Sequence, residues 1–116
     1  MGGAVWVSKN MPRPEGYQYL GGVVNGSAWD AFGELLDAAL LPEYFGVHSQ
    51  VKSEEGLFLR YYSFDELSRS DFNLVVRVVM GFIFNMLDPS PWQLKGKAVW
   101  DEVVGPCIKS DPRYEL

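Results

Sequence analysis

The chain has 116 residues, 47% of them hydrophobic and 15% aromatic, which excludes a disordered segment and fits one domain with a single core. Fifteen acidic residues against ten basic ones give a formal net charge of -5. The basic residues are scattered along the chain, so direct binding to nucleic acid is disfavoured. The acidic charge favours a basic protein partner through faster encounter, although it also serves plain solubility.

The sequence indicates neither a membrane span nor a targeting signal. Its longest apolar run, residues 71–87, is interrupted by Arg77. The first ten residues lack a basic leader followed by a long apolar region, so we do not expect a secretory signal. The single cysteine, Cys107, cannot form an intramolecular disulfide and is expected to be a partly buried, inert thiol. A cytoplasmic location is the resulting expectation.

The first quarter of the chain predicts short strands. Glycines and prolines punctuate residues 1–16 too often for a long element, so only residues 4–7 are expected to form a strand. Residues 17–24, YQYLGGVV, favour a second strand with a bulge or bend at the glycine pair. Asn25-Gly26 then indicates a turn, and Ser27 is predicted to be the N-cap of a helix.

Residues 28–41 carry the clearest amphipathic pattern. Large apolar residues recur at three- and four-residue spacing, and Pro42 ends the predicted helix. Three carboxylates share the opposite side of this helix: Asp30, Glu34 and Asp37. Two interpretations stay open for them. They form either a solvated helix face or an acidic strip that binds a basic partner and extends to Glu43.

The next segment is predicted to be a β-hairpin. Residues 44–51 and 57–63 resemble two strands, and the polar residues 52–56 suit the connection between them. His48, the only histidine, falls in the first of these strands. The sequence indicates neither a nucleophile nor an orienting acid near His48. The spacing of the ligand-type side chains does not suggest a metal site. We therefore expect a structural or surface histidine, with no metal or cofactor bound.

Two helices are predicted in the C-terminal half. Ser63 and Glu66 match a capping box, and Ser70 is predicted to cap a helix over residues 71–87. This helix is apolar nearly all round, so we expect the rest of the domain to enclose it, and Gly81 suggests close packing against a neighbour.

The second of these helices is expected at residues 92–104. Pro91 suits its first turn, and Gly105-Pro106 is predicted to end it. The whole order predicts an α+β fold, with a small antiparallel sheet packed against three or four helices in a single domain over residues 1–116.

The C-terminal half resembles the small immunity proteins of bacterial contact-dependent growth inhibition and related polymorphic toxin systems. The residues that carry this resemblance are Asp71-Phe72-Asn73, Pro91-Trp92, Trp100, Pro106 and Asp111-Pro112-Arg113-Tyr114. The resemblance implies a cytoplasmic, non-enzymatic inhibitor that binds a cognate toxin domain, often a basic nuclease. It supplies no shared toxin-binding residues.

The residues predicted to bind such a partner therefore come from this sequence itself. They are acids and two aromatic residues, namely Asp30, Glu34, Asp37, Glu43, Tyr44, Glu54, Glu55 and Tyr61. Two other functions stay open. A structural or accessory adaptor protein of a phage or mobile element would share the acidic α+β build. A small hydrolase or isomerase would depend on His48.

Overall fold

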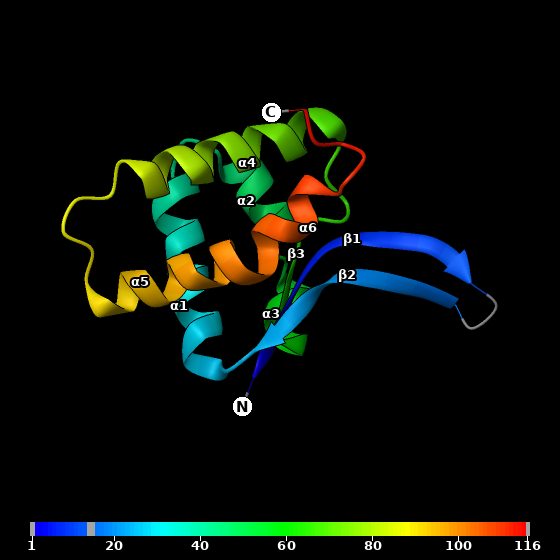
Figure 1. Cartoon of the computed structure of the whole chain (residues 1–116), viewed down its shortest axis with the longest axis horizontal. Helices are drawn as coiled ribbons and strands as arrows, with labels where there is room; N and C mark the ends of the chain where they lie inside the picture. Colours follow the sequence, from blue (N-terminus) through cyan, green and yellow to red (C-terminus); the bar gives the residue numbers. More distant parts are fainter. Residues whose placement is uncertain (1, 14–15, 116) are drawn as a thin grey trace.

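A long antiparallel ribbon forms the N-terminal part of the molecule. In the computed structural model, which describes residues 2–13 and 16–115, β1 spans Gly3–Arg13 and β2 spans Gly16–Val24. The ribbon extends away from the helices (Figure 1). The expectation of only a short strand before residue 16 is therefore wrong. Two register shifts in β1 accommodate the irregular sequence without ending the strand.

The predicted bend at the glycine pair of β2 has a clear backbone cause. Gly21 has a φ of +155°, and a Cβ atom at this position would collide with the carbonyl oxygen of Val5. Only glycine accepts this conformation and this approach of the neighbouring strand.

The sheet is mixed, although the predicted α+β class is confirmed. A third strand, β3 (Tyr61–Ser63), pairs with β1 in parallel, and the strand order is β2-β1-β3. The remainder of the predicted hairpin is helical, with α2 at Phe45–Val51 and α3 at Glu54–Leu59. The hairpin prediction is wrong because Val47 and Val51, four residues apart, both point into the core.

Helix α1 (Gly26–Leu40) confirms the amphipathic pattern. Its N-cap is Asn25 rather than Ser27, since the Oδ1 atom of Asn25 accepts a hydrogen bond from the backbone N–H of Ala28 at 2.8 Å. The helix packs its apolar side into the core, where Phe32 lies between the rings of Tyr62 and Trp100.

Helix α4 (Arg69–Phe84) begins after a cap that sequence reasoning placed incorrectly. Ser68, and not Ser70, accepts the capping hydrogen bond from Asp71. Ser63 and Glu66 do not begin a helix. Ser63 closes strand β3, and its hydroxyl accepts from the N–H of Asp65 in a turn.

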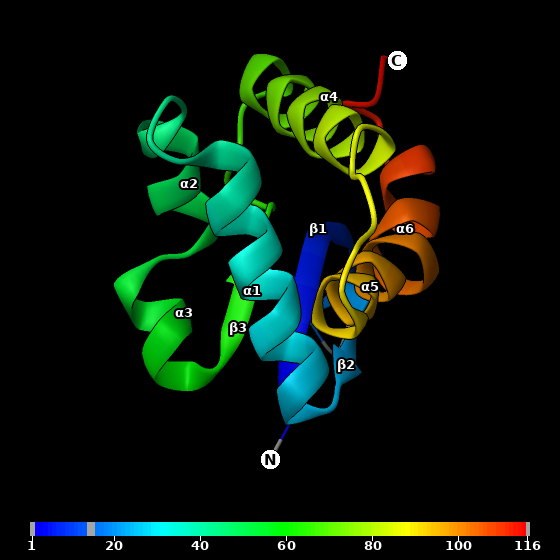
Figure 2. The same ribbon diagram turned by 90° about the vertical axis from the view of Figure 1, so that its left-hand side faces the viewer.

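The predicted enclosure of α4 is also wrong. Its first half is buried at Phe72, Val75 and Val76, but Phe84 is 89% exposed. A Cβ atom at Gly81 would meet nothing within 4 Å, so the expected close packing there is absent. In the second half of α4 Val79 is still fully buried, so only part of its surface is uncovered. Figure 2 shows α4 at the end of the molecule opposite the N-terminus.

The last helical segment is longer than predicted. Helix α5 (Pro91–Val99) starts with Pro91 behind a capping box formed by Ser90 and Gln93. It continues through the π-helical turn η1 (Trp100–Val104) into α6 (Gly105–Lys109). Gly105-Pro106 therefore does not end the helix, because Pro106 lies in the first turn of α6, where no N–H is needed.

Among the described residues, no helix is both long enough and apolar enough to cross a lipid bilayer.

Candidate functional site

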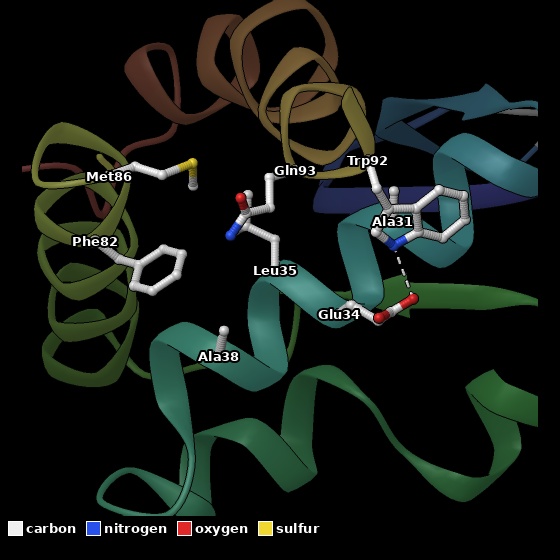
Figure 3. A pocket seen from close by; sticks show the side chains of 8 residues that line it. All are labelled: Ala31, Glu34, Leu35, Ala38, Phe82, Met86, Trp92 and Gln93. Carbon is white, nitrogen blue, oxygen red and sulfur yellow. Dashed lines mark hydrogen bonds between the residues drawn. The ribbon is translucent and has the colours of Figure 1, made fainter. Parts of the chain in front are cut away.

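An open groove lies between the C-terminal halves of α1 and α4, and α5 closes one end of it. It consists of two adjoining cavities of about 170 and 510 Å³, which share Phe82, Met86 and Gln93. Figure 3 shows the smaller cavity, with Phe82 directed from α4 towards Leu35 of α1 and Met86 entering from the segment that follows α4. We call this feature the α1–α4 groove. It is lined by Ala31, Glu34, Leu35, Ala38, Ala39, Glu43, Tyr44, Val78, Gly81, Phe82, Asn85, Met86, Leu87, Trp92 and Gln93.

The groove exists because the lining side chains of the two helices are small at several positions. Ala38 and Ala39 of α1 and Gly81 of α4 leave open space where larger residues would meet. Around them the lining mixes apolar side chains with the polar Tyr44, Asn85 and Gln93, and Leu87 is 89% exposed to water. A hollow with exposed apolar side chains is typical of a binding surface.

Carboxylates stand at both ends of the groove. At one end the Oε2 atom of Glu34 accepts a hydrogen bond of 2.8 Å from the indole N–H of Trp92 (Figure 3). At the other end Glu43 is exposed in the turn that follows α1. Neither Glu34 nor Glu43 forms an ion pair within the described part of the chain.

The described residues that line the groove include no lysine, arginine or histidine. One cation lies beside it: the Nζ atom of Lys95 is 5.7 Å from the centroid of the Trp92 ring and donates to the hydroxyl of Ser27. The groove therefore combines apolar side chains with two carboxylates, and this lining suits a ligand that is both apolar and positively charged.

Asp37, the third acid predicted on this helix, does not line the groove. Its Oδ1 atom lies 2.7 Å from Nε2 of His48 and 2.8 Å from Nζ of Lys52, which ties α1 to α2. Burial raises the pKa of Asp37, but the hydrogen bonds from Lys52 and His48 outweigh this effect and hold the pKa below its ordinary value. Asp37 is thus paired with Lys52 and His48 although its side chain is 40% exposed, and it contributes little to an acidic strip.

His48 has the orienting acid that sequence reasoning did not find, because α2 brings it to Asp37. The described part of the chain contains no group of three or more histidine, cysteine or acidic residues placed to hold a metal ion. The half-buried Cys107 is a weak nucleophile, because burial raises the pKa of its thiol.

The other predicted binding residues lie elsewhere. Asp30 is exposed on α1. Burial is the largest cause that raises the pKa of the Tyr62 hydroxyl, and the negative charge of Asp30 is the second largest. Glu55 and Tyr61 line a separate hollow of about 430 Å³ beside β3, and Glu54 is exposed in the first turn of α3. Of the eight predicted residues, the structure brings three together in the groove, namely Glu34, Glu43 and Tyr44.

Helix α3 presents a second exposed apolar surface. Leu57, Phe58 and Leu59 are 48%, 86% and 57% exposed. Only Gly56 of this helix is buried, so α3 projects its side chains from the molecule. Sequence reasoning missed these residues because it placed them in a strand.

The groove residues of α4 and α5 were also missed. The signal was present in the sequence: the apolar residues of 71–87 cover more than one helix face, which suits either complete burial or an uncovered binding surface. The structure shows an uncovered side chain at Leu87, which is 89% exposed, whereas Phe82 and Met86 are half-buried against the core.

Comparisons with protein-family models, with curated proteins and with solved structures find no match for this chain.

Proposed function

We propose that this chain is a non-enzymatic, cytoplasmic immunity protein that binds and neutralises a cognate toxin domain. The observation that carries the proposal is the α1–α4 groove, where Glu34 and Glu43 stand at the two ends of an apolar hollow without a cationic lining residue. The resemblance of the C-terminal half to immunity proteins supports the same function.

The groove combines the two features that tight inhibition of a basic protein needs. Its carboxylates attract a positively charged partner over a distance and speed encounter. Its apolar side chains, Phe82, Met86 and Leu87, can then be covered by the partner, which gives the complex its lifetime.

The lining favours binding over catalysis. Its polar side chains include carboxylates, amides and the Tyr44 hydroxyl. The described lining has no serine, cysteine or histidine that could act as a nucleophile or as its general base. His48 is bound to Asp37, and neither residue lines the groove.

Co-expression tests this function. The toxin candidate is the variable C-terminal domain of a large secreted protein encoded directly upstream of this chain. Cells that express the domain alone should stop growing, whereas cells that also express this chain should grow, and the two proteins should co-purify. Growth arrest in the presence of the folded chain, without co-purification, would contradict the proposal.

A second candidate function has its own observation in its favour. The exposed Leu57, Phe58 and Leu59 of α3 would suit an adaptor that assembles with a scaffold protein. An adaptor of a phage or mobile element would bind its partner without rescuing cells from a toxin, so the growth assay separates the two functions.

A further inference from the structure

We propose that the α1–α4 groove holds an amphipathic helix of the partner, with basic residues at the two ends of the bound stretch and an apolar face between them. The inference rests on the proposed function for the identity of the partner. The helical shape and the charge of the bound segment are inferred from the groove alone.

The shape of the groove suits a helix. Ala31, Glu34, Leu35, Ala38 and Ala39 line the groove from α1, whereas Val78, Gly81 and Phe82 line it from α4, and Asn85 and Met86 from the segment that follows Phe84, the end of α4. The α1 set follows the spacing i, i+3, i+4, i+7 and i+8, which is one side of a helix over about two turns, and the α4 set follows i, i+3 and i+4, which is one side over about one turn. Two such helix sides with a hollow between them form the site into which a third helix packs.

The floor of the groove allows close approach of this third helix. Ala38, Ala39 and Gly81 contribute almost no side-chain volume, whereas Phe82, Met86 and Leu87 supply apolar contacts around them. Leu87, which is largely exposed in the free protein, would be covered by the bound helix.

The two carboxylates of the groove determine where the bound helix carries its basic residues. Glu34 lies in α1 and Glu43 lies in the turn beyond Leu40, the last residue of α1, so more than one helical turn of the chain separates the two carboxylates. Lysine or arginine residues about two turns apart on the partner helix would reach both carboxylates. Glu34 is already oriented by Trp92, so it loses little freedom on binding.

A second copy of this chain is a poor occupant of the groove. It would bring its own net charge of -5 to an acidic lining, which disfavours encounter. A basic segment of another protein has the complementary charge.

A binding assay with synthetic peptides tests the inference. The probe is a fluorescent amphipathic peptide of roughly four helical turns, built from leucine, alanine and two lysines about two turns apart. Its twin carries glutamate in place of each lysine. Fluorescence anisotropy should show that wild-type protein binds the lysine peptide and not the glutamate twin, and that added salt weakens the binding.

Two substitutions at one position provide the matched control. Gly81→Leu should fill the groove and weaken binding of the lysine peptide by about tenfold or more, whereas Gly81→Ala, which adds one methyl group, should leave binding nearly unchanged. Circular dichroism should show both variants folded, because open space surrounds Gly81. The double variant Glu34→Gln/Glu43→Gln should lose most of the salt dependence.

Three outcomes would overturn the inference: no binding to the wild-type protein, equal binding of both peptides, or equal binding to folded Gly81→Leu and Gly81→Ala. The growth assay separates this result from the proposed function. Rescue by Gly81→Leu equal to that by Gly81→Ala would reject the groove as the toxin site and leave the immunity function in place. Selective peptide binding without rescue by the wild-type chain would reject the immunity function alone.

Discussion

Arg113 fastens the C-terminal segment to distant parts of the chain. Its guanidinium donates hydrogen bonds to the carbonyl oxygens of Phe64, Leu67 and Val7 at 2.9, 2.8 and 2.9 Å. It also pairs at 2.7 Å with Asp111, whose side chain is 1% exposed. A charged donor that serves several buried acceptors at once is costly to remove, since the three carbonyl oxygens and the carboxylate would each lose this donor.

We predict that Arg113→Met lowers the free energy of unfolding by about 3–5 kcal/mol, because the buried Asp111 would lose its cation. Urea denaturation measures the change. Lys109→Met is the matched control; Lys109 is exposed on α6, and its replacement should change stability by about 0.5 kcal/mol or less. Similar losses in both variants would refute the role of Arg113.

Asp37 and Asp111 make stability depend on acid pH. Burial raises the pKa of each carboxyl, but hydrogen bonds from Lys52 and His48 to Asp37, and from Arg113 to Asp111, outweigh it, so both pKa values are lowered. The folded state therefore binds fewer protons than the unfolded state near the ordinary aspartate pKa of about 3.9. The stabilisation is present above that pH and is lost as the pH falls through the lower, folded pKa.

Because folding lowers the pKa values of Asp37 and Asp111, we predict that the free energy of unfolding of the wild-type protein decreases as the pH is lowered from about 5 towards 3. Asp37→Asn should be less stable at pH 7 and should lose less stability over the same range. Denaturant titrations at several pH values measure both curves. Parallel curves for the two proteins would show that Asp37 does not contribute.

At the scale of elements, two glycines have opposite roles. Gly81 lies in the interior of α4 with open space around it, so Gly81→Ala should raise the free energy of unfolding by about 0.5–1 kcal/mol. Gly21 lies in β2 with a φ of +155° beside the Val5 carbonyl, so Gly21→Ala should destabilise the ribbon. Thermal unfolding of both variants tests this; a change of the same sign in both would contradict it.

Local signals were sufficient to predict the longest helices. The apolar stripe of α1, the proline at the start of α5 and the run of α4 all mark helices that the structure contains. The segment 44–59 could not be predicted in the same way. Its helices are short, and strand β3 depends on a parallel pairing with β1, which lies far away in the sequence.

The groove was only partly predictable for a related reason. The acidic pattern identified Glu34 and Glu43, because carboxylates on one helix side are visible in the sequence. The other wall comes from α4, and the position of α4 beside α1 depends on tertiary packing, which local sequence patterns do not specify. Gly81 shows the difficulty, since a helical glycine indicates either close packing or open space, and the structure has open space.

At the scale of the whole molecule, the net charge and the groove act together. A chain with a formal charge of -5 attracts a basic protein from a distance, and an apolar groove with carboxylates at its ends can retain it. The long-range electrostatic attraction affects the association rate, whereas the contacts inside the groove affect the dissociation rate. Reversal of the groove carboxylates should slow association, and obstruction of the groove should speed dissociation.

The most direct test is the affinity of this chain for the purified toxin candidate of the co-expression experiment, measured with wild type, Glu34→Lys/Glu43→Lys and the control Glu102→Lys. Glu102 is exposed on η1 and does not line the groove. The account predicts that the double variant binds at least about tenfold more weakly than wild type, most clearly at low salt, while Glu102→Lys changes affinity far less. Equal affinity of all three proteins would contradict it.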